Sequence, residues 1–171
     1  MIFAKALTMK KDLAITSAQF LVLTVLATVA PLLGHNQAVT GPIVNAALFI
    51  AVALLGAQNA ILVGLIPSVV ALSAGLLPAV LAPMIPFIMI SNTVLIITFA
   101  VFKRRNFWLG VLMASVFKFI FLIGTSTVVS DLIVKQEIAQ KAVSMMSWPQ
   151  LATALAGGLI AYLILKGIKK E

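Results

Sequence analysis

The sequence predicts an all-α integral membrane protein, a compact bundle of about six transmembrane helices that forms one domain over residues 1–171. Three observations lead to this fold class. Of the residues, 63% are hydrophobic and only 9% are charged, against roughly a quarter in soluble domains. Mean hydropathy is +1.20. Nine of the twelve lysines and arginines lie in three short clusters beside apolar runs, within residues 5–11, 103–105 and 166–170.

The three basic clusters indicate topology rather than nucleic-acid binding, because lysine and arginine beside apolar spans concentrate on the cytoplasmic side. We therefore expect a multi-pass protein with both termini in the cytoplasm. The first apolar run is longer than the core of a signal peptide, so it is expected to be a retained helix. The chain contains no cysteine, which excludes disulfides, thiolate metal sites and cysteine nucleophiles.

The first three helices are predicted from apolar runs bounded by proline, glycine and polar residues. The first is expected over Leu13–Leu33, the second from Pro42 to about Gly56, and the third from Ala60 to about Gly75. The second and third would have about 15 residues each and span roughly 22 Å, less than the ~30 Å hydrocarbon core. They are expected either to cross a locally thin membrane or to form a re-entrant pair.

The second half of the chain predicts three further helices and two outer segments. The helices are expected over Pro86–Phe102, from Phe107 to about Val129, and over Pro149–Leu165. Residues 76–85, with two prolines, predict an apolar loop packed on the outer end of the bundle. Residues 130–147 predict a short amphipathic helix on the outer surface.

Lys118 is the most informative single residue. It lies about 12 residues after the basic turn and 13 before Asp131, near the bilayer midplane, where a lysine costs about 2.5 to 3.5 kcal/mol and requires a partner. All four acids of the chain are expected at or beyond the membrane interfaces. Two interpretations follow: a neutral lysine hydrogen-bonded to helix carbonyls or to Asn92, or a cation that binds an anionic ligand group or a partner subunit's acid. Ser115 and Thr125 are expected on the same helix face.

Further polar residues concentrate in the predicted outer half, where they could line a pocket that faces outward. Prolines also stand at or near the expected outer N-termini of three helices, and such N-termini attract anions, although proline commonly starts helices without a ligand. Each of these residues also has an explanation without a ligand. A loop histidine can simply be solvated, and a tryptophan can anchor the protein at the membrane interface. Buried amides can serve contacts between helices. The candidate ligand-binding residues, besides Lys118, are Asn45, Asn92, Gln150, Thr153, Trp148 and His35.

Sequence motifs for catalysis are absent. The chain has no GxxxxGK[ST] phosphate loop, no HExxH, no DxD and no serine–histidine–aspartate grouping, and it contains a single histidine. We therefore expect no enzymatic activity, no metal site and no cofactor.

Small residues line two helices and allow close helix approach. The first helix carries the AxxxA spacing Ala14–Ala18, and the last carries a run around Gly157 and Gly158. Packing inside the monomer or a separate partner could explain either stripe. With the six-helix layout and the run GPIVNAALFIAVALLGAQNAILVGLIPS at positions 41–68, the chain resembles the substrate-binding S components of energy-coupling factor (ECF) transporters.

This resemblance implies a prokaryotic plasma-membrane subunit that captures a small, vitamin-like organic solute from the outer side. It further implies a transmembrane coupling subunit, docked at Ala14 and Ala18, and paired ATPase subunits that supply energy. Lys118 would neutralise an anionic solute, polar outer residues would orient it, and the loop at 76–85 would gate access. The alternatives are a membrane subunit or assembly factor of a larger enzyme complex, in which Lys118 pairs with another chain's acid, and an ion-conducting oligomer.

Overall fold

A computed structural model describes the chain except for residues 1, 34–36, 74–83, 133–139, 141–142 and 169–171. The described residues form six helices of 18 residues or more and no strand. A short helical segment at 143–146 precedes the last of them. The helices are α1 (Ile2–Leu33), α2 (Gln37–Leu54), α3 (Gly56–Ser73), α4 (Ile85–Phe102), α5 (Phe107–Leu132) and α7 (Trp148–Ile168).

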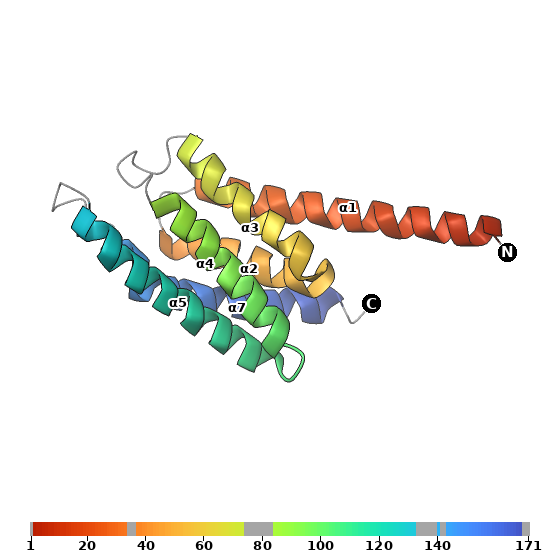
Figure 1. Cartoon of the computed structure of the whole chain (residues 1–171). Helices are drawn as coiled ribbons and strands as arrows, with labels where there is room; N and C mark the ends of the chain where they lie inside the picture. Colours follow the sequence, from red (N-terminus) through yellow and green to blue (C-terminus); the bar gives the residue numbers. More distant parts are fainter. Residues whose placement is uncertain (1, 34–36, 74–83, 133–139, 141–142, 169–171) are drawn as a thin grey trace.

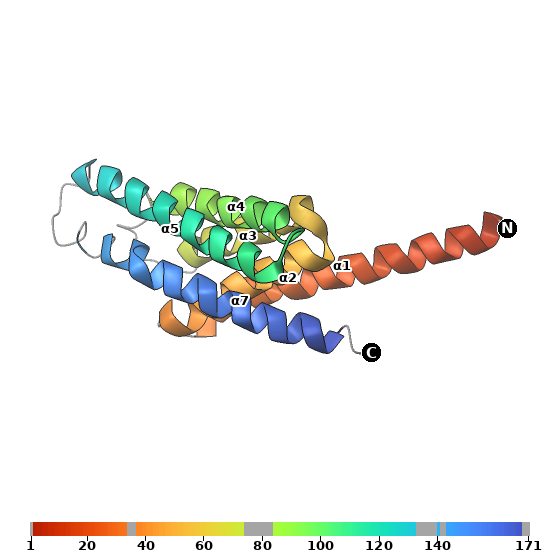
Figure 2. The ribbon, with the colours of Figure 1, turned by 90° about the horizontal axis from the view of Figure 1, so that it is seen from below.

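The helices run up and down beside one another, so that both ends of the chain lie at one end of the bundle (Figures 1 and 2). The turn between α4 and α5, which carries residues 103–105, lies at that same end (Figure 1). The N-terminal part of α1 projects beyond the other helices in both views (Figures 1 and 2). All seven residues from 12 to 18 are exposed. Because α1 leaves the bundle, much of its surface has no neighbour among the described helices.

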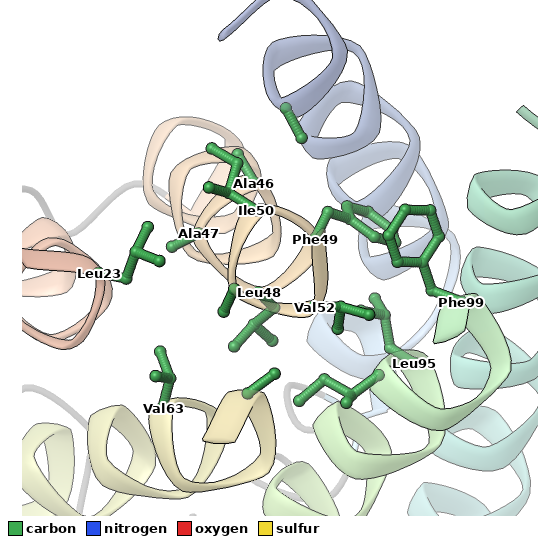
Figure 3. Packing of buried hydrophobic residues seen from close by; sticks show 14 of the residues in the cluster. Leu23, Ala46, Ala47, Leu48, Phe49, Ile50, Val52, Val63, Leu95 and Phe99 are labelled. Carbon is green, nitrogen blue, oxygen red and sulfur yellow. The ribbon is translucent and has the colours of Figure 1, made fainter. Parts of the chain in front are cut away.

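The core is built around α2. Eight consecutive residues of α2, 45–52, are buried, so this helix is covered on all sides. Its apolar side chains meet Leu23 of α1, Val63 of α3 and Leu95 of α4 (Figure 3). Phe49 packs edge-on against Phe99 of α4, with ring centroids 4.7 Å apart. A helix that is apolar all round belongs in the middle of a bundle.

Five helices are long and apolar enough to cross a membrane, which bears out the predicted all-α architecture. The described apolar stretch of the remaining helix, α3, is shorter and covers Gly56–Val70. Large apolar side chains are exposed on the outside of the bundle, among them Leu163 at 59% and Ile120 at 55%. Such surface is typical of a protein that faces lipid.

Three helix starts differ from the prediction by four residues or more, and one of them is α3, which begins at Gly56 rather than Ala60. α1 begins at Ile2 rather than Leu13, since the intervening residues are good helix formers without glycine or proline. α2 begins at Gln37, which places Pro42 at its sixth position, so the prediction that this proline starts the helix is wrong. Its ring removes only one hydrogen bond of the first turns. Pro86 and Pro149 do stand at the second positions of α4 and α7.

The junction of α2 and α3 lies where the sequence predicted a break. Gly56 has a φ of 80°, a left-handed conformation that glycine adopts without steric penalty. α2 and α3 have 18 residues each, about 27 Å at 1.5 Å per residue, and so are longer than predicted. The predicted outer loop at 76–85 lies outside the described residues up to residue 83, and much of 130–147 does likewise.

Candidate functional site

Lys118 lies in the middle of α5 and is buried inside the bundle. It stands eleven residues after the start of the helix and is only 4% exposed. Among the described residues no carboxylate pairs with it, and the one described acid whose side chain is placed, Asp12, is exposed at the far end of α1. The compensation for the ammonium group must therefore come from dipoles.

Two asparagines supply those dipoles. The Lys118 Nζ donates to Asn45 Oδ1 of α2 at 2.8 Å and to Asn92 Oδ1 of α4 at 2.9 Å. Both asparagines are themselves buried, at 2% and 4% exposed. Because an ammonium group has only donors, both amides must present their oxygens to it. We call Lys118, Asn45 and Asn92 the polar triad.

The surrounding helices fix the two asparagines. Asn92 Nδ2 donates to the carbonyl oxygen of Gly64 in α3 at 3.0 Å. Gly157 of α7 lies directly behind Asn45, where a Cβ atom would come within 2.7 Å of the Asn45 Cβ. Five helices thus converge on the triad, and a larger residue at Gly157 would displace Asn45.

Two donors of the triad have no acceptor among the described residues. An ammonium group has three N–H bonds, of which Lys118 uses two. Asn45 accepts from Lys118 through its oxygen, and no described residue accepts from its amide nitrogen. The unused donors mark the side of the triad where an acceptor would bind.

An apolar cluster lies next to the triad toward the opposite end of the bundle from the termini. Met84, Leu122 and Met146 are buried there, and Phe87 and Ile88 pack against them. We call these five residues the outer apolar cluster. It is separate from the main core around α2. The triad therefore lies between two apolar regions.

Other predicted polar residues lie near the start of α7. Gln150 Nε2 donates to the carbonyl oxygen of Met145 at 3.3 Å, and Gln37 Nε2 of α2 donates to the same oxygen at 2.9 Å. Thr153 is buried, and its hydroxyl donates to the carbonyl oxygen of Gln150 at 3.2 Å. These contacts tie α2 to α7 at the outer end but do not reach Lys118. The role of Gln37 was not predicted from its loop-like sequence context.

The remaining candidates stand apart from the triad. Trp148 is 71% exposed at the first position of α7, and His35 lies outside the described residues. Ser115 and Thr125, expected on the face of Lys118, donate to carbonyls of their own helix, those of Val111 and Phe121. Both hydroxyls thus form hydrogen bonds within α5 and not with the triad.

The end of the bundle that holds the termini has different contacts. Lys103 Nζ donates to the carbonyl oxygen of Val52 in the last turn of α2 at 2.7 Å. The negative end of the helix dipole also stabilises a cation at this position. Trp108 and Tyr162 pack at 4.8 Å between ring centroids. The predicted docking residues Ala14 and Ala18 are both exposed on the projecting part of α1.

Comparisons with protein-family models, with curated proteins and with solved structures find no match for this chain.

Proposed function

We propose that this protein is a substrate-capture subunit of an ECF-type importer, which binds a small anionic organic solute from the outer side of the membrane. The observation that carries the proposal is the buried cation Lys118, which is held by amide oxygens and lacks a carboxylate partner among the described residues. An ionisable residue in the middle of a membrane helix bundle most often serves function.

The direction of access follows from the arrangement of the helices. The basic residues Lys103, Arg104 and Arg105 lie at the end of the bundle with the termini, which the excess of positive charge assigns to the cytoplasm. Among the described residues beyond the triad, the buried cluster of Met84, Leu122 and Met146 is apolar, and the hydrogen-bonded side chains of Gln37 and Gln150 are uncharged. A solute would therefore enter from the outer end and present its anionic group to Lys118.

Energy would come from other subunits, because the sequence carries no phosphate-binding loop of its own. The projecting part of α1 offers a surface for a transmembrane coupling subunit. Its exposed small residues Ala14 and Ala18 would allow a partner helix to approach closely.

The burial of Lys118 argues against the alternative of a complex subunit in which this lysine pairs with another chain's acid. The side chain is 4% exposed and is enclosed by helices of its own chain. An acid of a second protein could reach it only if α2, α4 and α5 separated. A small solute needs much less movement.

The first test is to purify the full chain in mild detergent, denature it, and identify co-purified small molecules by mass spectrometry. Lys118→Met should lose the bound solute, since it removes the cation but keeps an unbranched side chain that is only one heavy atom shorter. Lys166→Met is the matched control, because it removes an exposed lysine near the end of α7. A solute retained equally by all three proteins would refute the role of Lys118. A co-purified protein in place of a solute, released only by Lys118→Met, would favour the complex subunit.

A further inference from the structure

In its ammonium form, Lys118 gives the polar triad a single positive charge. Among the described residues, no second cation contacts Asn45, Asn92 or Lys118. The nearest basic residue along α5 and its preceding turn is Arg105, which is exposed at the other end. One cation in a medium of low dielectric is best neutralised by one negative charge, because a dianion would leave a buried excess.

The two unused donors of the triad suit a carboxylate. The third N–H of Lys118 and the amide nitrogen of Asn45 stem from groups already joined at 2.8 Å, so both can point at one small acceptor group. A carboxylate has two oxygens and accepts from two donors at once. Phosphate recognition generally uses arginine or several backbone N–H groups, and the triad offers neither.

The outer apolar cluster lies one helical turn beyond the triad on two antiparallel helices. Leu122 follows Lys118 by four residues on α5, and Ile88 precedes Asn92 by four residues on α4. Residues four apart share a helix face. A solute that reached Lys118 along this face of α4 and α5 would therefore contact Leu122 and Ile88.

We propose that the solute is an amphipathic monocarboxylate, whose carboxylate takes the free donors of Lys118 and Asn45 and whose apolar body lies in the outer apolar cluster. This inference rests on the proposed capture function and specifies the class of solute. Two members of the cluster, Met84 and Met146, are methionines, whose flexible thioether side chains repack readily around a bound group. Leu122, one helical turn beyond Lys118, would contact the part of the apolar body next to the carboxylate.

The test uses the purified full chain, immobilised in mild detergent and incubated with one defined mixture of probes. The mixture contains phenylacetate and hexanoate, the matched amides phenylacetamide and hexanamide, the hydrophilic acid lactate, the phosphate ester phenyl phosphate and the amine phenethylamine. Retained compounds are quantified by mass spectrometry. Ratios of compounds retained in one sample decide the outcome, because partial loss of folded protein lowers the retention of all probes alike.

Wild type should retain phenylacetate or hexanoate over its own amide and over lactate by tenfold or more. Lys118→Met should abolish the preference for carboxylate over amide. Leu122→Ala should keep that preference and lower the ratio of phenylacetate to lactate by roughly tenfold. Ile120→Ala is the matched control, since Ile120 lies on the same helix but is 55% exposed and faces outward.

The outcomes separate the inference from the function on which it rests. Preferential retention of phenyl phosphate, phenethylamine or the amides would overturn the monocarboxylate assignment but leave capture in place. Preferential retention of lactate would overturn the apolar body of the solute and also leave capture in place. If wild type retains no probe and carries no co-purified solute, both the assignment and the capture function fall. An unchanged phenylacetate-to-lactate ratio in Leu122→Ala would exclude the outer apolar cluster as the site of the apolar body.

Discussion

The interaction of Lys118 with two neutral amides determines how this residue can be buried. Amide dipoles offset part of the desolvation of an ammonium group, whereas a carboxylate would form an ion pair and remove the local charge. The oxygens of Asn45 and Asn92 fix the ammonium at 2.8 and 2.9 Å without neutralising it. Under the proposed function, this ammonium group would bind an anion that comes from outside the chain.

At the residue scale, a double-mutant cycle tests whether the triad acts as a unit. Lys118→Met leaves two buried amide oxygens without a donor, and Asn92→Leu leaves Lys118 with one acceptor and Gly64 without its side-chain donor. Each substitution should lower the free energy of unfolding by about 1–3 kcal/mol. The free energy of unfolding lost in the double variant should be about 0.5–2 kcal/mol smaller than the sum of the losses in the two single variants.

The cycle is measured by unfolding in one detergent. A second cycle that pairs Lys118→Met with Leu163→Ala serves as the control, because Leu163 is 59% exposed on α7. That pair should be additive within about 0.5 kcal/mol. Additivity in both cycles would mean that Lys118 and Asn92 are not energetically coupled.

At the element scale, α2 and α7 pack closely because small residues lie between them. A Cβ atom on Gly157 would come within 2.9 Å of the backbone nitrogen of Ala46, and one on Gly41 within 2.9 Å of the side chain of Thr153. Backbone atoms cannot move aside as a flexible side chain can. The position of α7 against α2 therefore also sets the position of Asn45.

Two glycines of α7 give a matched comparison. Gly157→Ala should lower the free energy of unfolding by about 1–3 kcal/mol, because α7 must move away from α2. Gly167→Ala should leave it unchanged or raise it by up to about 1 kcal/mol, since no atom lies within 4 Å of the added methyl group and alanine favours the helix. Unfolding of both variants in the same detergent checks the pair. Equal effects would contradict the close contact.

The two small-residue stripes illustrate what sequence alone could predict. Both were compatible with packing inside the monomer and with a partner. In the structure Gly157, Gly158 and Ala154 are buried within the bundle, whereas Ala14 and Ala18 are exposed. The pattern of small residues is the same in both helices, so only the three-dimensional arrangement separates them.

The sequence predicted a lysine in the middle of a helix, because its position follows from counting residues. It also named Asn92 as one possible hydrogen-bond partner of a neutral lysine, and the structure shows that contact. It grouped Asn45 with Gln150 and Thr153, which the structure places at two different levels. Which polar residues meet depends on the rotation of each helix about its axis. Weakly amphipathic, uniformly apolar helices do not encode that rotation in their periodicity. The starts of α1 and α2 were missed for a different reason. Residues 2–12 carry four charged side chains and residues 37–41 are QAVTG, so neither stretch belongs to an apolar run.

At the scale of the whole molecule, charge distinguishes the two ends of the bundle. The termini, the basic turn at 103–105 and Lys166 in the last turn of α7 share one end (Figure 1). Trp148 and Ser144, both exposed, belong to the opposite end. The excess of lysine and arginine therefore predicts that the end with the termini faces the cytoplasm and that Trp148 faces outward.

The absence of cysteine from the sequence makes this orientation directly measurable. Single variants Ser144→Cys and Trp148→Cys should react with a membrane-impermeant maleimide in intact cells. Arg104→Cys and Lys166→Cys should react only after the membrane is permeabilised, and the unmodified chain gives the background. Labelling of Arg104→Cys from outside would reverse the topology and place the outer apolar cluster on the cytoplasmic side. Capture of an external solute would then be impossible by the route proposed, because Lys118 would be approached first through the basic end.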